Sequence, residues 1–276
     1  MSGTENKAEI FTITEMVEPA AERETMRKSP RMFEQYVQPC LAELYGTTLF
    51  VFVGCASVMG NIGQFGVLQA AMAHGLALAV LIMLFGKISG GHFNPVVSVS
   101  VYLCGGMKLA LLLPYILAQM LGGLLGAALT RGVFPDNIYN ASFGGSFLVG
   151  PTADLGKITL VEVIMTLFLT LAVCMGAVNK KTSSPVAAFC IGLTVSANIL
   201  AGGQLSGACM NPARAFGPAV VAGQWGFHWI FWTGPLCGAL ITVTLVSSFA
   251  SFCGHLESFH DHFVGMFAIG NHIVPL

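Results

Sequence analysis

The sequence contains little charge. Only 9% of its 276 residues are Asp, Glu, Lys or Arg, whereas 55% are hydrophobic. A soluble domain of this size would expose far more charged side chains to water, so the composition predicts a polytopic membrane protein. The formal net charge of −1 also argues against nucleic acid as a partner, because nucleic-acid binding needs a basic surface.

The eight cysteines form no CxxC pair and no spacing typical of zinc ligands. They lie singly, several of them in apolar segments, and we expect buried thiols that pack as small hydrophobic groups. Near the end of the chain, His255, His260 and His262 could bind a metal, but a solvated tail is the interpretation we favour. We therefore expect no metal and no cofactor.

Six apolar runs reach or approach the length of about 20 residues that a membrane-spanning helix needs. Two shorter apolar segments, 94–105 and 211–223, interrupt this series. Each is about half as long as the hydrocarbon layer is thick. The predicted spans lie near residues 38–60, 67–86, 109–131, 158–178, 186–203 and 228–250.

Both short segments follow the same string, Ser-Gly-x-x-x-Asn-Pro, which occurs at 89–95 and again at 206–212. We interpret the short segments as re-entrant half-helices, whose preceding loops must be buried in protein or line an aqueous cavity. Because three spans belong to each half, the second half is inverted relative to the first. The fold class is thus an all-α membrane protein with six transmembrane helices and two half-helices. They form two inverted repeats, at about 37–131 and 157–250, within a channel-like domain 37–250.

Basic residues indicate the orientation in the membrane. They gather before the first span, beside the first half-helix and between spans four and five. By the positive-inside rule, residues 1–36 and 251–276 are cytoplasmic tails. The first 36 residues are polar, which fits neither a cleavable signal peptide nor a transit peptide. The glycosylation triplet that begins at Asn140 then falls outside, although an unused triplet is an equal alternative.

The Asn-Pro pairs are suited to begin helices inside a membrane. Pro95 and Pro212 lack the N–H that would be unpaired at a first helical position, and Asn94 and Asn211 can accept hydrogen bonds from the first turn. Each amide NH2 then points away from its helix, and each helix dipole adds partial positive charge. Two such tips at one depth would donate to neutral water and repel cations. A single Asn-Pro pair is usually only a turn. Two copies in repeats of opposite orientation favour a functional site instead.

Three charged side chains lie in the predicted membrane region at informative positions. Glu43 precedes Asn94, and Glu162 precedes Asn211, at nearly the same spacing. Each could relay protons, but we favour an acceptor for the irregular backbone before its half-helix. Arg214 follows the second motif and is predicted to face a pore, where its fixed charge repels cations. A salt bridge is the alternative.

Other residues carry weaker signals. His74 stands in an otherwise apolar run, and from the residues alone we expect a buried histidine with satisfied hydrogen bonds. The glycine pairs 122/126 and 234/238 are predicted to lie where helices cross closely.

With the twin Asn-Pro motifs, Arg214 and the paired glutamates, the sequence from about 38 to 250 resembles the aquaporin (major intrinsic protein) family. The resemblance implies a homotetramer in lipid, with one single-file pore in each subunit. It identifies Cys209 with the pore cysteine that mercurials attack. The implied pore motifs are Asn94-Pro95-Val96 and Asn211-Pro212-Ala213, and the implied outer constriction is His74, Ile199, Ala208 and Arg214.

The same resemblance implies a range of solutes. Strictly water-selective relatives have Phe at the place of His74 and His at the place of Ile199, so ammonia and hydrogen peroxide are expected besides water. Glycerol channels have Asp where Ala215 stands, so glycerol is not expected. Val96 replaces the usual alanine and is expected to affect packing and conductance.

We therefore predict a passive channel for water and small neutral solutes, not an enzyme. A secondary transporter with inverted repeats is one alternative. A poorly conducting structural protein, suggested by Val96, is another. The plasma membrane is the expected location, with intracellular and mitochondrial membranes as alternatives.

Overall fold

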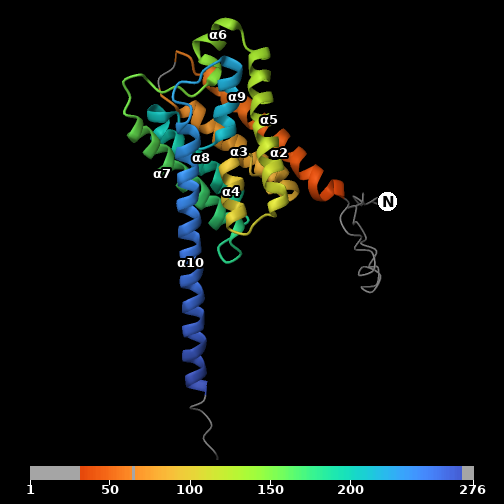
Figure 1. Ribbon diagram of the computed structural model, residues 1–276, viewed down its shortest axis with the longest axis vertical. Coiled ribbons are helices and arrows are strands. Elements are labelled where there is room, and N and C mark those ends of the chain that lie inside the picture. The colour runs from red at the N-terminus through yellow and green to blue at the C-terminus, as the bar shows by residue number, and fades with distance from the viewer. Residues whose placement is uncertain (1–31, 64–65, 269–276) are drawn as a thin grey trace, which may run out of the picture.

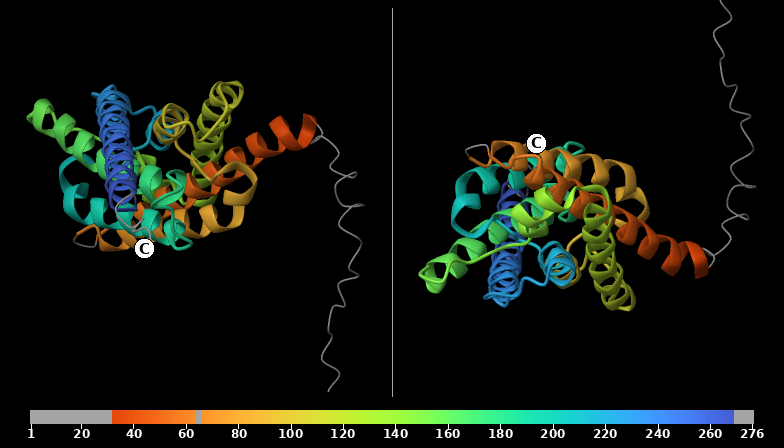
Figure 2. Two further views of the ribbon diagram at one scale, coloured as in Figure 1. Left: turned by 90° about the horizontal axis from the view of Figure 1, so that it is seen from below. Right: turned by 90° about the horizontal axis from the view of Figure 1, so that it is seen from above.

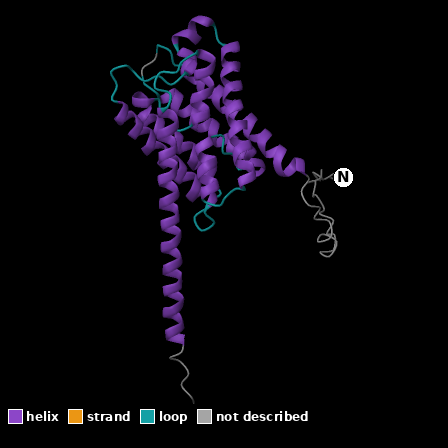
Figure 3. Cartoon of the chain, viewed as in Figure 1, coloured by secondary structure: helices purple, strands orange, loops and turns teal. Residues whose placement is uncertain are grey.

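The computed structural model describes residues 32–63 and 66–268, with side chains as far as Phe249. Helices joined by loops make up the described part, in which no strand is found (Figures 1 and 3). The histidines of the predicted tail, and residues 1–31, lie outside the described side chains. The elements are η1 (Phe33–Val37), α2 (Gln38–Met59), α3 (Leu68–Ser89), α4 (Pro95–Leu103), α5 (Leu109–Val133), α6 (Asp136–Ala141), η2 (Phe143–Gly145), α7 (Leu155–Val173), η3 (Cys174–Val178), α8 (Ala187–Ser206), α9 (Pro212–Ala222) and α10 (Ile230–Ala268).

Six helices in the described part are long and apolar enough to cross a membrane, which confirms the six predicted spans. Most ends agree with the prediction within three residues; the fourth span reaches its predicted end at Val178 only with η3, which continues α7. The largest difference is at α10, which continues to Ala268 whereas the predicted span ends at 250 (Figure 1). The sequence has no proline between Pro235 and Pro275 that would break the helix there.

The two predicted half-helices are α4 and α9. Each begins directly after its motif asparagine, with proline in the first turn. The glycine of each motif explains the turn before it, because Gly90 (φ +92°) and Gly207 (φ +83°) end α3 and α8 in the left-handed conformation. Only glycine adopts this conformation without cost. The Ser-Gly part of the motif thus ends a span and returns the chain into the bundle.

The half-helices approach each other from opposite ends of the bundle. Seen along the long axis, both lie between α5 and α10 (Figure 2). In the side view, α9 lies toward the end that carries α6, the α6 end (Figure 1). The half-helix α4 lies toward the end that carries the loop around Lys180, the Lys180 end. This arrangement is the one expected of two inverted repeats.

Glycines allow the spans to cross closely, as predicted. A Cβ atom on Gly126 of α5 would lie 2.5 Å from the Thr48 carbonyl oxygen of α2, and one on Gly238 of α10 would lie 2.4 Å from the Val163 oxygen of α7. The crossing of α2 with α5 in the first repeat corresponds to the crossing of α7 with α10 in the second. A third close contact joins α5 to the half-helix α9, between Gly123 and Gly217.

Replacing Gly217 with alanine should destabilise the bundle, because the new Cβ would lie 2.1 Å from the Gly123 carbonyl oxygen. Overpacking of this kind costs about 1–3 kcal/mol. We expect a lower thermal unfolding midpoint of the detergent-solubilised protein. Gly132→Ala on α5 is the control, since nothing lies within 4 Å of that Cβ. Equal midpoints for the two variants would contradict this account of the crossing.

Candidate functional site

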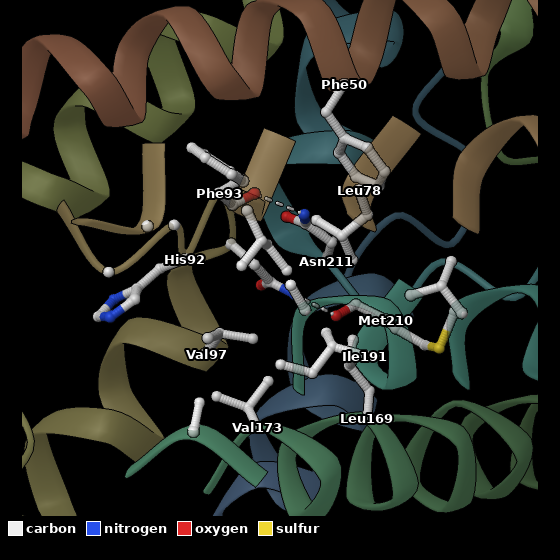
Figure 4. A pocket seen from close by; sticks show the side chains of 18 of the residues that line it. Phe50, Leu78, His92, Phe93, Val97, Leu169, Val173, Ile191, Met210 and Asn211 are labelled. Carbon is white, nitrogen blue, oxygen red and sulfur yellow. Dashed lines mark hydrogen bonds between the residues drawn. The ribbon is translucent and has the colours of Figure 1, made fainter. Parts of the chain in front are cut away.

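The two motif asparagines meet at the centre of the bundle, and each is bonded to the loop of the other repeat. Asn94 Nδ2 donates to the Met210 carbonyl oxygen at 2.8 Å, and Asn211 Nδ2 donates to the Phe93 oxygen at 2.9 Å (Figure 4). One hydrogen of each amide is thereby used. Each asparagine keeps a single N–H without a partner in the described part, whereas the sequence analysis expects the whole NH2 group to be available.

The oxygen of each asparagine caps its own half-helix. Asn94 Oδ1 accepts from the Val96 N–H at 3.1 Å. Asn211 Oδ1 accepts from the N–H groups of Ala213 at 3.0 Å and Arg214 at 3.2 Å. Both caps fix the amide plane and so determine which way the NH2 group faces. Val96 is 3% exposed. Its backbone N–H donates to the capping asparagine Asn94, as the N–H of Ala213 does to Asn211.

Glu43 is fully buried and holds the loop before α4. Its carboxylate accepts from the Ser89 hydroxyl at 2.6 Å and from the backbone N–H groups of His92 at 2.9 Å and Phe93 at 2.6 Å. Gln119 of α5 donates a fourth bond at 2.8 Å. These contacts satisfy backbone groups that would otherwise be unpaired inside the protein.

Glu162 is equally buried and holds the loop before α9 in the same way. It accepts from the Ser206 hydroxyl at 2.6 Å and from the N–H groups of Cys209 and Met210, both at 2.8 Å. The repeat symmetry anticipated from the spacing of the two glutamates therefore extends to individual hydrogen bonds. The serine of each motif is a site residue that sequence reasoning missed, although its presence in both copies was a signal.

Arg214 projects from the first turn of α9 and is 5% exposed. Its Nη1 donates to the carbonyl oxygens of Ala208 at 2.6 Å and Cys209 at 3.0 Å. The guanidinium carbon lies 4.7 Å from the ring centre of Phe147. Neither salt bridge found in the described part involves Arg214, and its buried Nε has no hydrogen-bond partner there. The arginine is therefore held by neutral acceptors, and no ion pair in the described part offsets its charge.

Two cavities of about 270 Å³ each lie on either side of Arg214, which lines both. The inner cavity is lined by both motif asparagines and by Cys209 (Figure 4). The outer cavity is lined by His74 and Ile199 and lies toward the α6 end. Three of the four residues of the expected constriction, His74, Ile199 and Arg214, thus line the outer cavity. Ala208, the fourth, is fully buried and contributes its carbonyl oxygen to Arg214.

The His74 ring is fixed as it borders the outer cavity. Its Nδ1 lies 2.7 Å from the Ala70 carbonyl oxygen, so Nδ1 carries the hydrogen of that bond. Gly54 of α2 makes room for the ring, because a Cβ there would lie 2.3 Å from His74 Nε2. The histidine is buried and bonded, as the residues alone suggested, and it also lines the cavity. Gly54 was not identified from the sequence.

Asn140 lies apart from this site, in the last turn of α6. It is exposed, and the Ser142 hydroxyl of its triplet donates to the carbonyl oxygens of Ile138 and Tyr139. Its glycosylation remains a prediction.

Comparisons with known proteins agree on one family. Residues 31–246 match the family described as Major intrinsic protein. Aquaporin-8 of Rattus norvegicus is 54% identical over 218 residues, which cover 79% of this chain and 83% of that protein. A probable aquaporin TIP-type of Medicago truncatula is 38% identical over 208 residues, 72% of this chain and 81% of that protein.

A solved structure shares the fold. The X-ray structure of the aquaglyceroporin from Plasmodium falciparum has a TM-score of 0.64 and 23% sequence identity. The matched region covers 76% of this chain and 94% of the aquaglyceroporin chain. At this identity the likeness concerns the architecture alone.

Replacing Glu162 with glutamine should weaken the loop before α9. The amide offers one oxygen where the carboxylate offers two, so a buried backbone N–H loses its acceptor, at a cost of about 1–3 kcal/mol. We expect a smaller folded fraction on size-exclusion chromatography after a mild heat step. Glu34→Gln makes the same chemical change at an exposed residue of η1. A variant at 162 as stable as the one at 34 would refute this role of the carboxylate.

Proposed function

Because this chain belongs to the major intrinsic protein (aquaporin) family of membrane channels, we propose that its pore conducts water, ammonia and hydrogen peroxide passively. In this proposal glycerol, protons and other ions are excluded. The observation that carries it is the meeting of two cavities at Arg214, with both motif asparagines at the wall of one of them. The proposed path runs from the α6 end past His74 and Arg214 to Asn211 and Asn94.

Rejection of ions follows from the charges along this path. The half-helix N-termini each contribute about half a positive charge, and Arg214 contributes a full one. Water can accept a hydrogen bond from the remaining N–H of each asparagine. A cation at the same place would lose hydration and face a repulsive field. Half-helix dipoles and a fixed arginine are recognised means of excluding protons and cations from such pores.

The solute range rests on the wall of the outer cavity. Ile199 presents an apolar surface there, in a wall that also contains His74, whose Nδ1 is bonded to the Ala70 carbonyl oxygen. Such a wall leaves room for small neutral solutes, and ammonia and hydrogen peroxide are small enough to follow water. Ala215, which stands where glycerol channels have Asp, is buried and apolar. Cys209 at the wall of the inner cavity is the proposed target of mercurials.

The alternatives receive less support. A transporter that couples to protons would need free carboxyl groups near the midplane, but those of Glu43 and Glu162 are already bonded to the loops. A structural protein without conductance was suggested by Val96, yet Asn94 keeps its cap beside that valine. We therefore retain the passive channel. We also propose a homotetramer in lipid, with both termini cytoplasmic and the plasma membrane as its location.

One series of measurements tests the proposal directly. The purified protein in liposomes should accelerate stopped-flow fluxes of water, ammonia and hydrogen peroxide, but not of glycerol. Protein-free liposomes serve as the control. Uptake that saturates at low solute concentration, or that needs an ion gradient, would support the transporter; unchanged swelling rates would support the structural protein.

Replacing Arg214 with valine should increase the leak of cations and protons. Two unit charges about 4 Å apart interact by about 4 kcal/mol at an effective dielectric constant of about 20. Since about 1.4 kcal/mol corresponds to a tenfold change, we expect at least about a tenfold rise in liposome conductance. Arg131→Val removes the same charge at an exposed position near α6. An unaltered leak in the first variant would contradict the charge barrier.

Replacing His74 with Phe and Ile199 with His together should reduce ammonia flux while water flux persists. The change narrows the outer cavity and adds a polar ring to its apolar wall. Stopped-flow measurements of both fluxes on one liposome preparation give the ratio. If the water flux and the ammonia flux decline equally, these residues do not form the selective constriction.

A further inference from the structure

Two cysteines that are 70 residues apart in the sequence lie in contact. The Sγ atoms of Cys104 and Cys174 are 3.8 Å apart, with the first thiol directed at the second sulfur. Cys104 caps the C-terminal end of the half-helix α4, and Cys174 begins η3 at the end of α7. Cys104 is partly exposed, whereas Cys174 is fully buried. The sequence had suggested only isolated thiols.

Both cysteines line a cavity of about 640 Å³ at the Lys180 end of the bundle. This cavity shares four lining residues with the inner pore cavity, namely Gly90, His92, Val173 and Ala177. The two spaces therefore adjoin, and the larger one forms the mouth of the proposed path. A solute that leaves the pore at this end enters the space that the two thiols line.

We propose that Cys104 and Cys174 form a redox-active dithiol that hydrogen peroxide converts reversibly to a disulfide, and that this disulfide constricts the mouth of the pore. The proposal rests on the sulfur contact and the shared cavity. It does not require peroxide to pass through the pore, because peroxide in the solution on this side reaches the same cavity.

The reaction is balanced in two steps. The accessible Cys104 sulfur attacks one oxygen of the peroxide; an S–O bond forms, the O–O bond breaks, and one water leaves with the thiol proton. The Cys174 sulfur then attacks the Cys104 sulfur; an S–S bond forms, the S–O bond breaks, and a second water leaves. The two thiols lose two electrons, and the peroxide gains them. Because Cys174 is buried against Cys104, it is placed to intercept the sulfenic acid before further oxidation.

The local backbone allows the sulfurs to approach. A disulfide bond is about 2.0 Å long, so the two Sγ atoms must approach each other by roughly 1.8 Å. Cys104 stands at the end of its helix and is followed by Gly105 in the left-handed conformation (φ +76°). A bond would tie α4 to the end of α7 across the mouth. Thiols on the cytoplasmic side, where basic residues predict this mouth to lie, form disulfides that are usually transient and redox-sensing.

Peptide mapping can detect the bond without ambiguity. Trypsin releases Cys104 as the only cysteine of peptide 88–108 and Cys174 as the only cysteine of peptide 158–180. Proteoliposomes of the full chain are treated with hydrogen peroxide, alkylated, digested without reduction and analysed by mass spectrometry. We expect the two peptides to appear linked and to separate again after treatment with a phosphine reductant. Peroxide treatment without the linked species would overturn the proposal.

Water permeability of the same vesicles gives the second readout. We expect a loss of permeability after peroxide that the reductant reverses. Cys104→Ser and Cys174→Ala should each conduct like the parent before oxidation, which shows that they fold, and should lose the sensitivity. Cys190→Ser, at an exposed position on α8, should remain sensitive. Sensitivity that persists without Cys104 would assign the effect to another thiol, and a linked pair without loss of permeability would refute the constriction.

Discussion

Two buried carboxylates support the central geometry of this channel. A re-entrant chain brings unpaired backbone N–H groups into a region without water, and each such group costs several kcal/mol unless it finds an acceptor. Glu43 and Glu162 provide those acceptors, one for each loop. Their charge is offset by three or four donors each. The asparagine caps and the close approach of the half-helices depend on loops held in this way.

The two repeats differ where function needs them to differ. Both have the serine, the glutamate and the capping asparagine, but only the second has Arg214 after its motif. In the first repeat, Gln119 adds a donor to Glu43 and also bonds Ser98 at 2.9 Å. The symmetric part thus builds the scaffold. The asymmetric part gives one side of the pore its fixed charge and leaves the other side with a buried polar network.

Much of this could be predicted from the sequence because the signals are local. Membrane-length apolar runs predicted the six spans, and the Asn-Pro pairs predicted where the half-helices begin, since proline restricts backbone angles regardless of the rest of the chain. The end of α10 was not predicted, because loss of hydropathy marks where a span ends and not where a helix ends. The family resemblance identified the positions of the site residues in the sequence, but it could not give the contacts that these residues make.

What the sequence alone determined is the set of six spans and two half-helices, the asparagine caps of the half-helices and the inverted order of the two halves, all of which follow from apolar length and backbone restriction. Only the tertiary structure decided that each asparagine bonds the loop of the other repeat. It also brought His74, Ile199 and Arg214 to one cavity, and Cys104 to Cys174. These contacts join residues far apart in the chain. They depend on how the helices pack against one another, which no single segment encodes.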